Sequence, residues 1–147
     1  MFQLVPAINT DMATIASFFG SHWEKQLYKK DLYNFGQFIE INGEKLGFFA
    51  LIPCDDDEGW LRSLYLKESF SPSMIMLGID WITRAAEHAR FQKIYAFSHS
   101  SSTDILFETW GFQKLTEQPA KIVDTIEQKG NWWMLSTSVD NSCGKPV

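Results

Sequence analysis

Residues 71–76 are the stretch whose types and spacing most directly suggest chemistry. Ser71 and Pro72 stand at the start of a predicted helix, where serine caps well and proline sacrifices no hydrogen bond. The preceding residues, 60–67, alternate in polarity as a strand does. A strand that leads directly into a helix points unpaired backbone N–H groups and a partial positive charge at whatever lies in front. The segment therefore predicts an anion site, of the kind that most often binds phosphate.

The helix that follows residue 72 must hold this site against a core. Its apolar residues recur at three- and four-residue spacing, which is typical of one buried helix face. These residues are Ile75, Ile79, Ile82, Ala86 and Ala89.

Further elements are predicted on both sides of this strand and helix. Residues 2–6 form a first strand, and Asn9, Thr10 or Asp11 caps a helix that reaches about Lys29. Asn42-Gly43 between two apolar runs is a strong hairpin signal, because both residues of that turn need positive φ. The hairpin strands are residues 33–41 and 45–52, with Gly36 and Gly47 marking bulges or bends.

The second half of the chain predicts a strand–helix–strand crossover. Residues 92–98 form a strand, 105–110 a short helix ended by Gly111, and 112–115 and 132–139 two more strands. Residues 120–128 are either a short helix or a surface loop. The predicted order is β-α-β-β-β-α-β-α-β-β, an α/β fold with a mixed sheet and helices on both faces, in one domain over residues 1–139. Residues 140–147 are predicted to be a flexible tail.

Composition excludes several classes of function. The net charge of −5 without a basic run argues against nucleic acid and anionic membranes as partners. Two cysteines, Cys54 and Cys143, give neither a disulfide framework nor metal-ligand spacing, and no signal sequence or membrane span is recognisable. We therefore expect a cytoplasmic protein. The acidic run 54–59 lacks the alternation of a Ca²⁺ loop and is predicted to be a solvated turn, so no metal is expected.

The layout resembles the GCN5-related N-acetyltransferase (GNAT) superfamily over about residues 2–139. The most specific string is LFETWGF, residues 106–112, which is similar to a short family helix that ends in Gly-Phe. The resemblance implies a GNAT-like fold and acetyl-CoA as cofactor, with its pantetheine arm hydrogen-bonded to the strand around Leu64, Tyr65 and Leu66. The pyrophosphate would lie at residues 71–76, which include Ser73.

Three departures from the family pattern bear on cofactor binding, and the first is in the pyrophosphate loop. There, Ser71 stands where the family carries Arg or Gln, and Met74 and Met76 replace two small residues on either side of Ile75. Glycine lets backbone N–H groups approach a diphosphate, and a bulky side chain obstructs that approach. The loop is therefore degenerate, and weaker binding of CoA is expected.

The other two departures lie in the crossover half of the chain. Phe107 replaces a frequent tyrosine and has no proton to give to a leaving thiolate. Ser100 replaces a frequent asparagine but keeps a donor and an acceptor, and Thr103 follows on the next turn. All three residues are expected to face the cofactor.

Acyl transfer to an amine requires a base, and three residues are candidates. His99 ends a strand beside the expected cleft, Glu40 lies on the second strand, and Tyr65 lies on the fourth. Each also has a structural interpretation: a turn hydrogen bond for His99, solvation for Glu40, and core or rim packing for Tyr65. Cys54 beside carboxylates is expected to have a raised thiol pKa, which disfavours a nucleophilic role.

Two functions remain open from the sequence. The first is an acetyl-CoA-dependent N-acetyltransferase that transfers directly to an unidentified small-molecule or peptide amine. The second is an inactive ligand-binding or protein-interaction module with the same fold. In the second case, residues 116–130 and one of Trp132 and Trp133 would line an apolar pocket, because adjacent strand residues face opposite sides. Residues 132–139 are a candidate edge for a homodimer.

Overall fold

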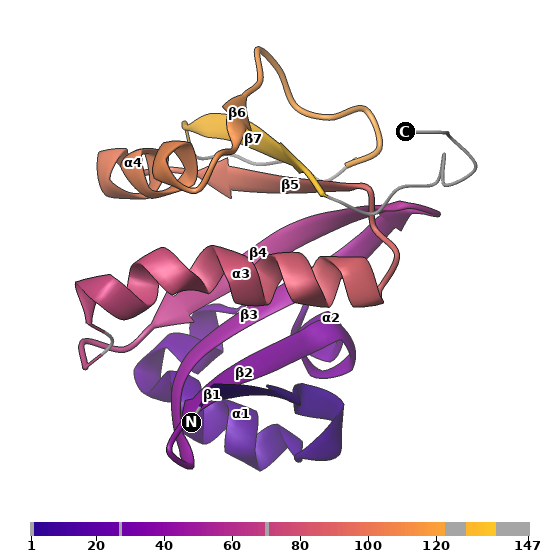
Figure 1. Cartoon of the computed structure of the whole chain (residues 1–147). Coiled ribbons are helices and arrows are strands. Elements are labelled where there is room, and N and C mark those ends of the chain that lie inside the picture. Colours follow the sequence, from indigo (N-terminus) through magenta and orange to yellow (C-terminus); the bar gives the residue numbers. More distant parts are fainter. Residues whose placement is uncertain (1, 27, 70, 123–128, 138–147) are drawn as a thin grey trace, which may run out of the picture. The chain divides into compact units, whose positions relative to one another are not determined.

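A computed structural model describes residues 2–26, 28–69, 71–122 and 129–137. The elements, in chain order, are β1 (Phe2–Pro6), η1 (Ala7–Asn9), α1 (Met12–Phe19), η2 (Gly20–Lys25), α2 (Lys29–Phe35), β2 (Gly36–Ile41), β3 (Glu44–Asp55), β4 (Glu58–Leu66), α3 (Pro72–His88), β5 (Lys93–Ser98), α4 (Ser101–Thr109), β6 (Gln113–Lys114) and β7 (Asn131–Ser136) (Figure 1). The strands hydrogen-bond in the order β1-β2-β3-β4-β5-β7-β6. Because β4 and β5 are parallel while β1–β2 and β5–β7 are antiparallel, the predicted mixed sheet is confirmed.

The chain packs as two compact units. The residues of β3, β4 and α3 are divided between them. Unit 1 comprises residues 1–52 and 62–77, and unit 2 comprises 53–61 and 78–147. The expectation of one domain over residues 1–139 stays a prediction. The tail, residues 140–147, lies outside the described residues, as do residues 123–128 and 138–139.

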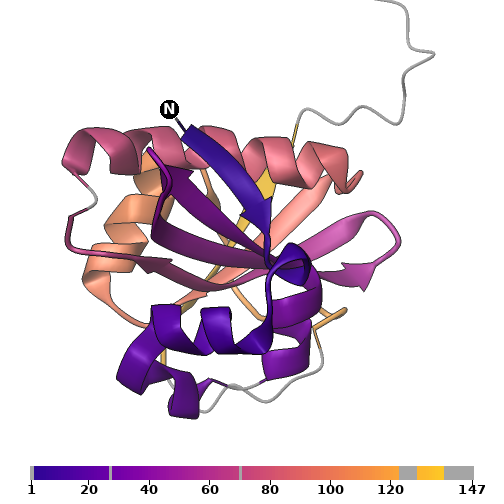
Figure 2. The ribbon, with the colours of Figure 1, turned by 90° about the horizontal axis from the view of Figure 1, so that it is seen from below.

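The core of unit 1 is aromatic. Helices α1 and α2 cover one face of β1, β2 and β3 (Figure 2). Phe18 and Phe19 of α1 meet Phe38 of β2 and Phe48 of β3, with ring centroids 5.0 Å apart for Phe19–Phe48 and 5.3 Å apart for Phe18–Phe38. Such edge-on contacts add to the stabilisation that burial of the rings provides.

The expectation of one long helix up to about Lys29 is wrong. Gly20 takes φ 59°, which glycine adopts without steric cost, and α1 ends there. Residues 20–25 then form the 3₁₀ helix η2, and Tyr28 with φ 60° precedes α2. The apolar stripe continued past Gly20 because Phe19 and Trp23 stack across the junction, with centroids 5.9 Å apart. Residues 33–35, predicted as the start of a strand, belong to α2, and β2 begins at Gly36.

The predicted hairpin between β2 and β3 is confirmed. Asn42 and Gly43 have φ 52° and 84°, as the two-residue turn requires. The register shifts between Ile39 and Glu40, which pair with Gly47 and Lys45 respectively, so a bulge lies beside the predicted Gly47.

Unit 2 has a separate aromatic core. Trp60, Tyr95, Ile122 and Trp132 form one buried cluster, and α4 lies beside β5, β6 and β7 (Figure 1). Both Trp132 and Trp133 are buried, so the expectation that one of them is exposed or lines a pocket is wrong. The reason is that β7 is covered on both faces: Trp132 contacts Trp60, and Trp133 contacts Phe107 of α4.

Several predicted boundaries also change in unit 2. Helix α4 begins at Ser101, four residues before the predicted start, because Ser100 caps it. Ala89 is exposed, and Gly78 and Trp81 instead complete the buried face of α3. Gly78 permits close packing, since a Cβ there would lie 3.0 Å from the Trp110 ring. Residues 116–122 contain no helix, and because residues 123–128 lie outside the described residues, the choice between helix and loop for 120–128 stays open.

Candidate functional site

Strand β4 has an irregular backbone at Ser63, which lies inside the strand with φ 55°. This left-handed conformation is rare for a residue other than glycine and marks an irregular strand. The pairing of β4 with β5 runs from Glu58–Lys93 to Leu61–Ala96 and ends there, although both strands continue. The backbone of residues 64–66 therefore lies beyond the part of β4 that pairs with β5.

Two side-chain contacts within unit 1 fix the irregular part of β4. The Ser63 hydroxyl donates to Gln26 Oε1 at 2.9 Å, and the Arg62 guanidinium lies 4.8 Å from the centroid of the Tyr28 ring. Tyr28 itself has φ 60°. The segment between η2 and α2 is thus tied to β4 at two consecutive residues. These four residues could not be selected from the sequence, because the two positive φ angles fall on Tyr28 and Ser63 and not on glycines.

Tyr65 belongs to the aromatic core of unit 1. Its ring centroid lies 5.5 Å from that of Phe18, 5.6 Å from Phe19 and 5.7 Å from His22. The interpretation of Tyr65 as a core or rim residue agrees with these contacts and with its half-buried side chain, and its role as a catalytic base stays a prediction.

The start of α3 is capped by its own sequence. The backbone N–H of Met74 donates to Ser71 Oγ at 3.2 Å, and Ile75 N–H donates to the Ser71 carbonyl at 3.0 Å. The predicted serine cap is confirmed, and it occupies one of the helix donors that an anion could otherwise use. Met76 is 53% exposed, whereas Met74 and Ile75 are half-buried and Ser73 is exposed.

The predicted residues of unit 2 cluster around the start of α4. His99 and Ser100 are exposed after the end of β5. Ser100 Oγ accepts from Thr103 N–H at 3.2 Å and lies 2.9 Å from Thr103 Oγ1, so the two hydroxyls form the helix cap. Phe107 is 3% exposed, and its ring lies 5.0 Å from that of Phe112, which leaves little of its surface for a cofactor.

The α4 helix is joined to β7 by a carboxylate that the sequence analysis did not select. Asp104 accepts from Trp133 Nε1 at 3.0 Å and from Asn131 Nδ2 at 3.1 Å. Partial burial by itself would raise the pKa of Asp104, but its hydrogen bonds together outweigh burial and hold the pKa below its usual value. A buried indole N–H needs a partner, which Asp104 provides.

Glu40 is buried, so the expectation that it is solvated is wrong. It is 8% exposed and accepts from Lys45 Nζ and Gln3 Nε2, each at 2.9 Å. The Lys45 hydrogen bond, followed by that of Gln3, holds its pKa below the usual value. A carboxylate stabilised in this way is a weak proton acceptor.

The acidic turn is partly buried, and the ammonium group of Lys121 pairs with two of its carboxylates. Asp55, Asp57 and Glu58 offer oxygens that lie within 4.8 Å of one another. Lys121 Nζ pairs with Asp55 and lies 3.3 Å from Glu58 Oε2, while the Tyr95 hydroxyl donates to Glu58 Oε1 at 3.0 Å. Asp55 and Asp56 are exposed as predicted, but Glu58 is 7% exposed and does not belong to a solvated tip.

The thiol of Cys54 behaves as the sequence predicted. Burial, with Glu58 and Asp55 nearby, raises its pKa to about 11. It is therefore protonated near neutral pH and a poor nucleophile.

No protein-family model and no curated protein matches the sequence. Solved structures match in shape. N-acetylglutamate synthase from Neisseria gonorrhoeae, complexed with coenzyme A and N-acetyl-glutamate, superposes with a TM-score of 0.74 at 17% identity over 92% of this chain. This chain spans 35% of the length of that synthase chain.

Shorter proteins match over their whole length. N-acetyltransferase PseH from Campylobacter jejuni, in complex with acetyl coenzyme A, gives a TM-score of 0.64 at 15% identity over 94% of this chain and 100% of that one. An acetyltransferase of the GNAT family from Staphylococcus aureus gives 0.64 at 12% identity, over 92% and 99%. The chain has the GNAT fold.

The GNAT fold confirms the architecture that the sequence resemblance implied. At identities of 12–17% the likeness establishes the fold and leaves the site residues of this chain as predictions. Among the described residues, no helix is both long and apolar enough to cross a membrane.

Proposed function

We propose that the protein is an acetyl-CoA-dependent N-acetyltransferase that acts on an amine by direct transfer. The observation that carries the proposal is the irregular backbone of β4 at Ser63, together with the end of β4–β5 pairing at Leu61 and Ala96. Its support from outside the chain is the GNAT fold, shared with a synthase complexed with coenzyme A and with PseH in complex with acetyl coenzyme A. A cytoplasmic location and a homodimer are parts of the same proposal, but the expected dimer edge at residues 132–139 is wrong, because β7 pairs with both β5 and β6.

The cofactor would be held mainly by backbone groups. Residues Leu64, Tyr65 and Leu66 would offer the hydrogen bonds of β4 to the pantetheine arm, beyond the paired part of the strand. The start of α3, from Ser71 to Met76, would receive the pyrophosphate, and Ser100, Thr103 and Phe107 would complete the site. The backbone suits this role, and the exposed side chain of Met76 is not locked in a core. Met74 N–H is taken by Ser71 Oγ, so binding would require that cap to open or share its donor.

Bound acetyl-CoA would supply an activated thioester, and the chain would have to orient the acceptor amine and remove its proton. Of the other two candidates, His99 offers an exposed imidazole nitrogen as the proton acceptor, and Tyr65 offers a phenol oxygen, which is a weak base. Glu40 is engaged by Gln3 and Lys45 and is held ionised, so it would accept a proton poorly. A His99→Ala and a Tyr65→Phe variant, assayed for kcat against pH, separate the two.

Calorimetry and thermal shift with acetyl-CoA test the proposal. A ligand present at 100 times its Kd stabilises the folded state by about 2.7 kcal/mol, which a melting curve resolves readily. Acetyl-CoA should raise Tm and release heat, and acetylation should be detected with a panel of amines. The absence of both a shift and heat at millimolar acetyl-CoA would reject the proposal.

The second candidate is a non-catalytic module with the same fold. Ser71 Oγ capping Met74 N–H favours it, because the chain itself satisfies a donor that the pyrophosphate would need. The triple variant Ser71→Arg, Met74→Gly, Met76→Gly should then gain CoA binding that the natural chain lacks. Leu77→Gly is the matched control, since Leu77 is also exposed on α3 and glycine costs a similar helix propensity there, about 1 kcal/mol.

A further inference from the structure

Unit 1 contains an open cavity of about 580 Å³ on the side of the sheet that α1 covers. This volume lies within the range of about 300–1,000 Å³ that is typical of small-molecule sites. It lies between α1, the β2–β3 turn and the residue that follows β4. Its lining is formed by Asp11, Ala13, Thr14, Ser17, Phe18, Gly43, Glu44, Lys45 and Lys67.

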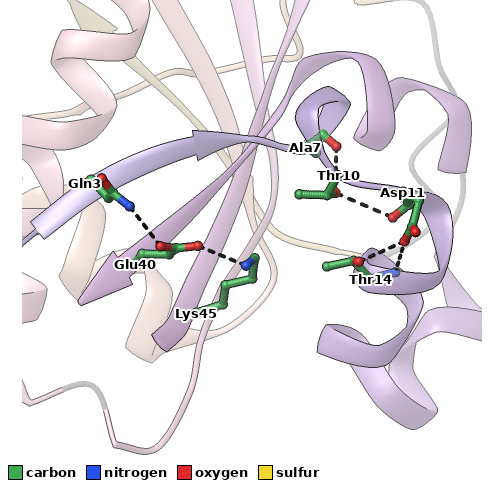
Figure 3. Close-up of polar contacts among 7 residues, drawn as sticks. All are labelled: Gln3, Ala7, Thr10, Asp11, Thr14, Glu40 and Lys45. Carbon is green, nitrogen blue, oxygen red and sulfur yellow. Dashed lines mark hydrogen bonds and ion pairs between the residues drawn. The ribbon is translucent and has the colours of Figure 1, made fainter. Parts of the chain in front are cut away.

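One wall carries a lysine that the protein holds in place. Lys45 Nζ donates to Glu40 Oε2 at 2.9 Å, and Gln3 Nε2 donates to the other oxygen of Glu40 at 2.9 Å (Figure 3). The ammonium also lies 5.5 Å from the centroid of the Phe38 ring. An ammonium has three donors, so the bond to Glu40 leaves others for a ligand. Its fixed position lowers the entropic cost of binding one.

Lys67 adds a second positive charge to this cavity. Its Nζ lies 4.8 Å from the centroid of the Phe18 ring, and the side chain is half-buried. Within residues 2–26, 28–69, 71–122 and 129–137, no carboxylate forms an ion pair with it. The aromatic face attracts the ammonium but does not neutralise it.

The lining of the cavity also carries a carboxylate that hydrogen bonds hold in place. Asp11 Oδ1 accepts both the backbone N–H and the hydroxyl of Thr14, each at 2.8 Å (Figure 3). In the part of the chain that the structure describes, no hydrogen bond reaches Asp11 Oδ2. The two Thr14 hydrogen bonds also hold the pKa of Asp11 below its usual value, so it stays ionised. Glu44, which is exposed, adds a second carboxylate to the same lining.

From this arrangement we propose that the cavity binds a small dipolar molecule that carries both a carboxylate and an ammonium group, such as an amino acid or short peptide. Lys45 and Lys67 would receive the carboxylate, and Asp11 and Glu44 the ammonium. A purely anionic ligand would be repelled by the two carboxylates and a purely cationic one by the two lysines, so the paired charges select the dipolar class. The site requires no CoA and so goes beyond the proposed function.

Binding is tested with the full chain in the absence of acetyl-CoA. Thermal shift with the proteinogenic amino acids and glycylglycine at millimolar concentration selects the best probe, and calorimetry gives its Kd. The amide of that probe lacks the carboxylate, and its N-acetyl derivative lacks the ammonium. Each should bind about tenfold more weakly or worse, which corresponds to 1.4 kcal/mol. If no probe binds, or if both analogues bind as well as the parent, the proposal is wrong.

Two variants assign the walls without removing the fold's supports. Lys67→Met keeps an apolar side chain over Phe18, and Asp11→Asn keeps a good helix cap. Lys67→Met should abolish the preference for the acid over the amide, and Asp11→Asn the preference for the amine over the N-acetyl form. Lys30→Met and Glu24→Gln, which change exposed residues outside the cavity, should leave both preferences intact. Equal losses in these controls would contradict the assignment. Because acetyl-CoA is absent throughout, the outcome is independent of whether the proposed transferase activity is found.

Discussion

Glu40 in unit 1 and Glu58 in unit 2 are two buried strand carboxylates with matching partners. They are 8% and 7% exposed, and each accepts from one neutral donor and one lysine. For Glu40 these are Gln3 and Lys45, and for Glu58 they are Tyr95 and Lys121. A buried carboxylate needs such partners, because desolvation without them is costly.

The difference between the two lies in where the lysine comes from. Lys45 belongs to the strand next to Glu40 in the same hairpin, and its side chain is 29% exposed. Lys121 lies 63 residues from Glu58 in a segment without helix or strand, is 48% exposed, and also pairs with Asp55. The first pair links the two strands of one hairpin beside the cavity of unit 1. The second ties an irregular segment to the β3–β4 turn of unit 2.

Lys45→Met should have the largest effect on stability. It leaves Glu40 buried with Gln3 as its remaining partner, so we expect a loss of about 2 kcal/mol, typical of hydrogen bonds to charged groups. Urea denaturation measures the change. Lys30→Met on exposed α2 surface controls for the loss of a charge. Adding Glu40→Gln to Lys45→Met should recover part of the loss, and a double variant as unstable as the sum of both would refute the pairing.

The same pair predicts how stability depends on pH. The folded-state pKa of Glu40 lies below the unfolded value of about 4.3, because Lys45 and Gln3 donate to the carboxylate. Its contribution is therefore present above that unfolded value and is lost as pH falls through the lowered folded-state pKa. The stability difference between the natural chain and Glu40→Gln should shrink over this acidic range. A difference that stays constant down to acid would contradict the assignment.

Tyr95→Phe should cost less, about 1.5 kcal/mol, because Glu58 keeps Lys121 after the phenol is lost. Burial, followed by the hydrogen bond to Glu58, raises the pKa of Tyr95 to about 12. The stabilisation is therefore complete below the unfolded pKa of about 10 and is lost as pH rises through the folded value. Absorbance titration of tyrosinate should show one late component, which Glu58→Gln should shift toward neutral pH. Its persistence in that variant would count against the hydrogen bond.

Some features of this fold could be predicted from the sequence and others could not. Asn42-Gly43, the Ser71 cap and Gly111 at the end of α4 were predictable, because each depends on local backbone geometry. The role of Glu40 could not be predicted, because its burial leaves no local pattern in the sequence. The role of Lys121 could not be predicted either, because its partner Glu58 lies 63 residues away.

The cavity of unit 1 shows the same limit. Asp11 was selected as one of three possible helix caps, but its pairing with a lysine-lined wall depends on how α1 packs on the sheet. The contact of Lys67 with the Phe18 ring arises only in the folded core, because the two residues lie far apart in the sequence. Positive φ at Tyr28 and Ser63 likewise depends on tertiary contacts, which override the ordinary preferences of those residues.

Lys121→Met should have the smallest global effect and the most local one. Its half-exposed ammonium is screened by water, so Tm should change less than in Tyr95→Phe. The segment 115–122 should instead open more often, because Lys121 is its charged link to Asp55 and Glu58. Backbone hydrogen bonds from Leu115 to Trp132 and from Ile122 to Pro119 remain. Hydrogen exchange of these amides should therefore become several-fold faster while β2 and β3 keep their rates. Lys129→Met, an exposed lysine beyond this segment, is the matched control. Uniform acceleration over both units would show that Lys121 supports the whole fold, as Lys45 is expected to, and would remove the distinction between the two networks.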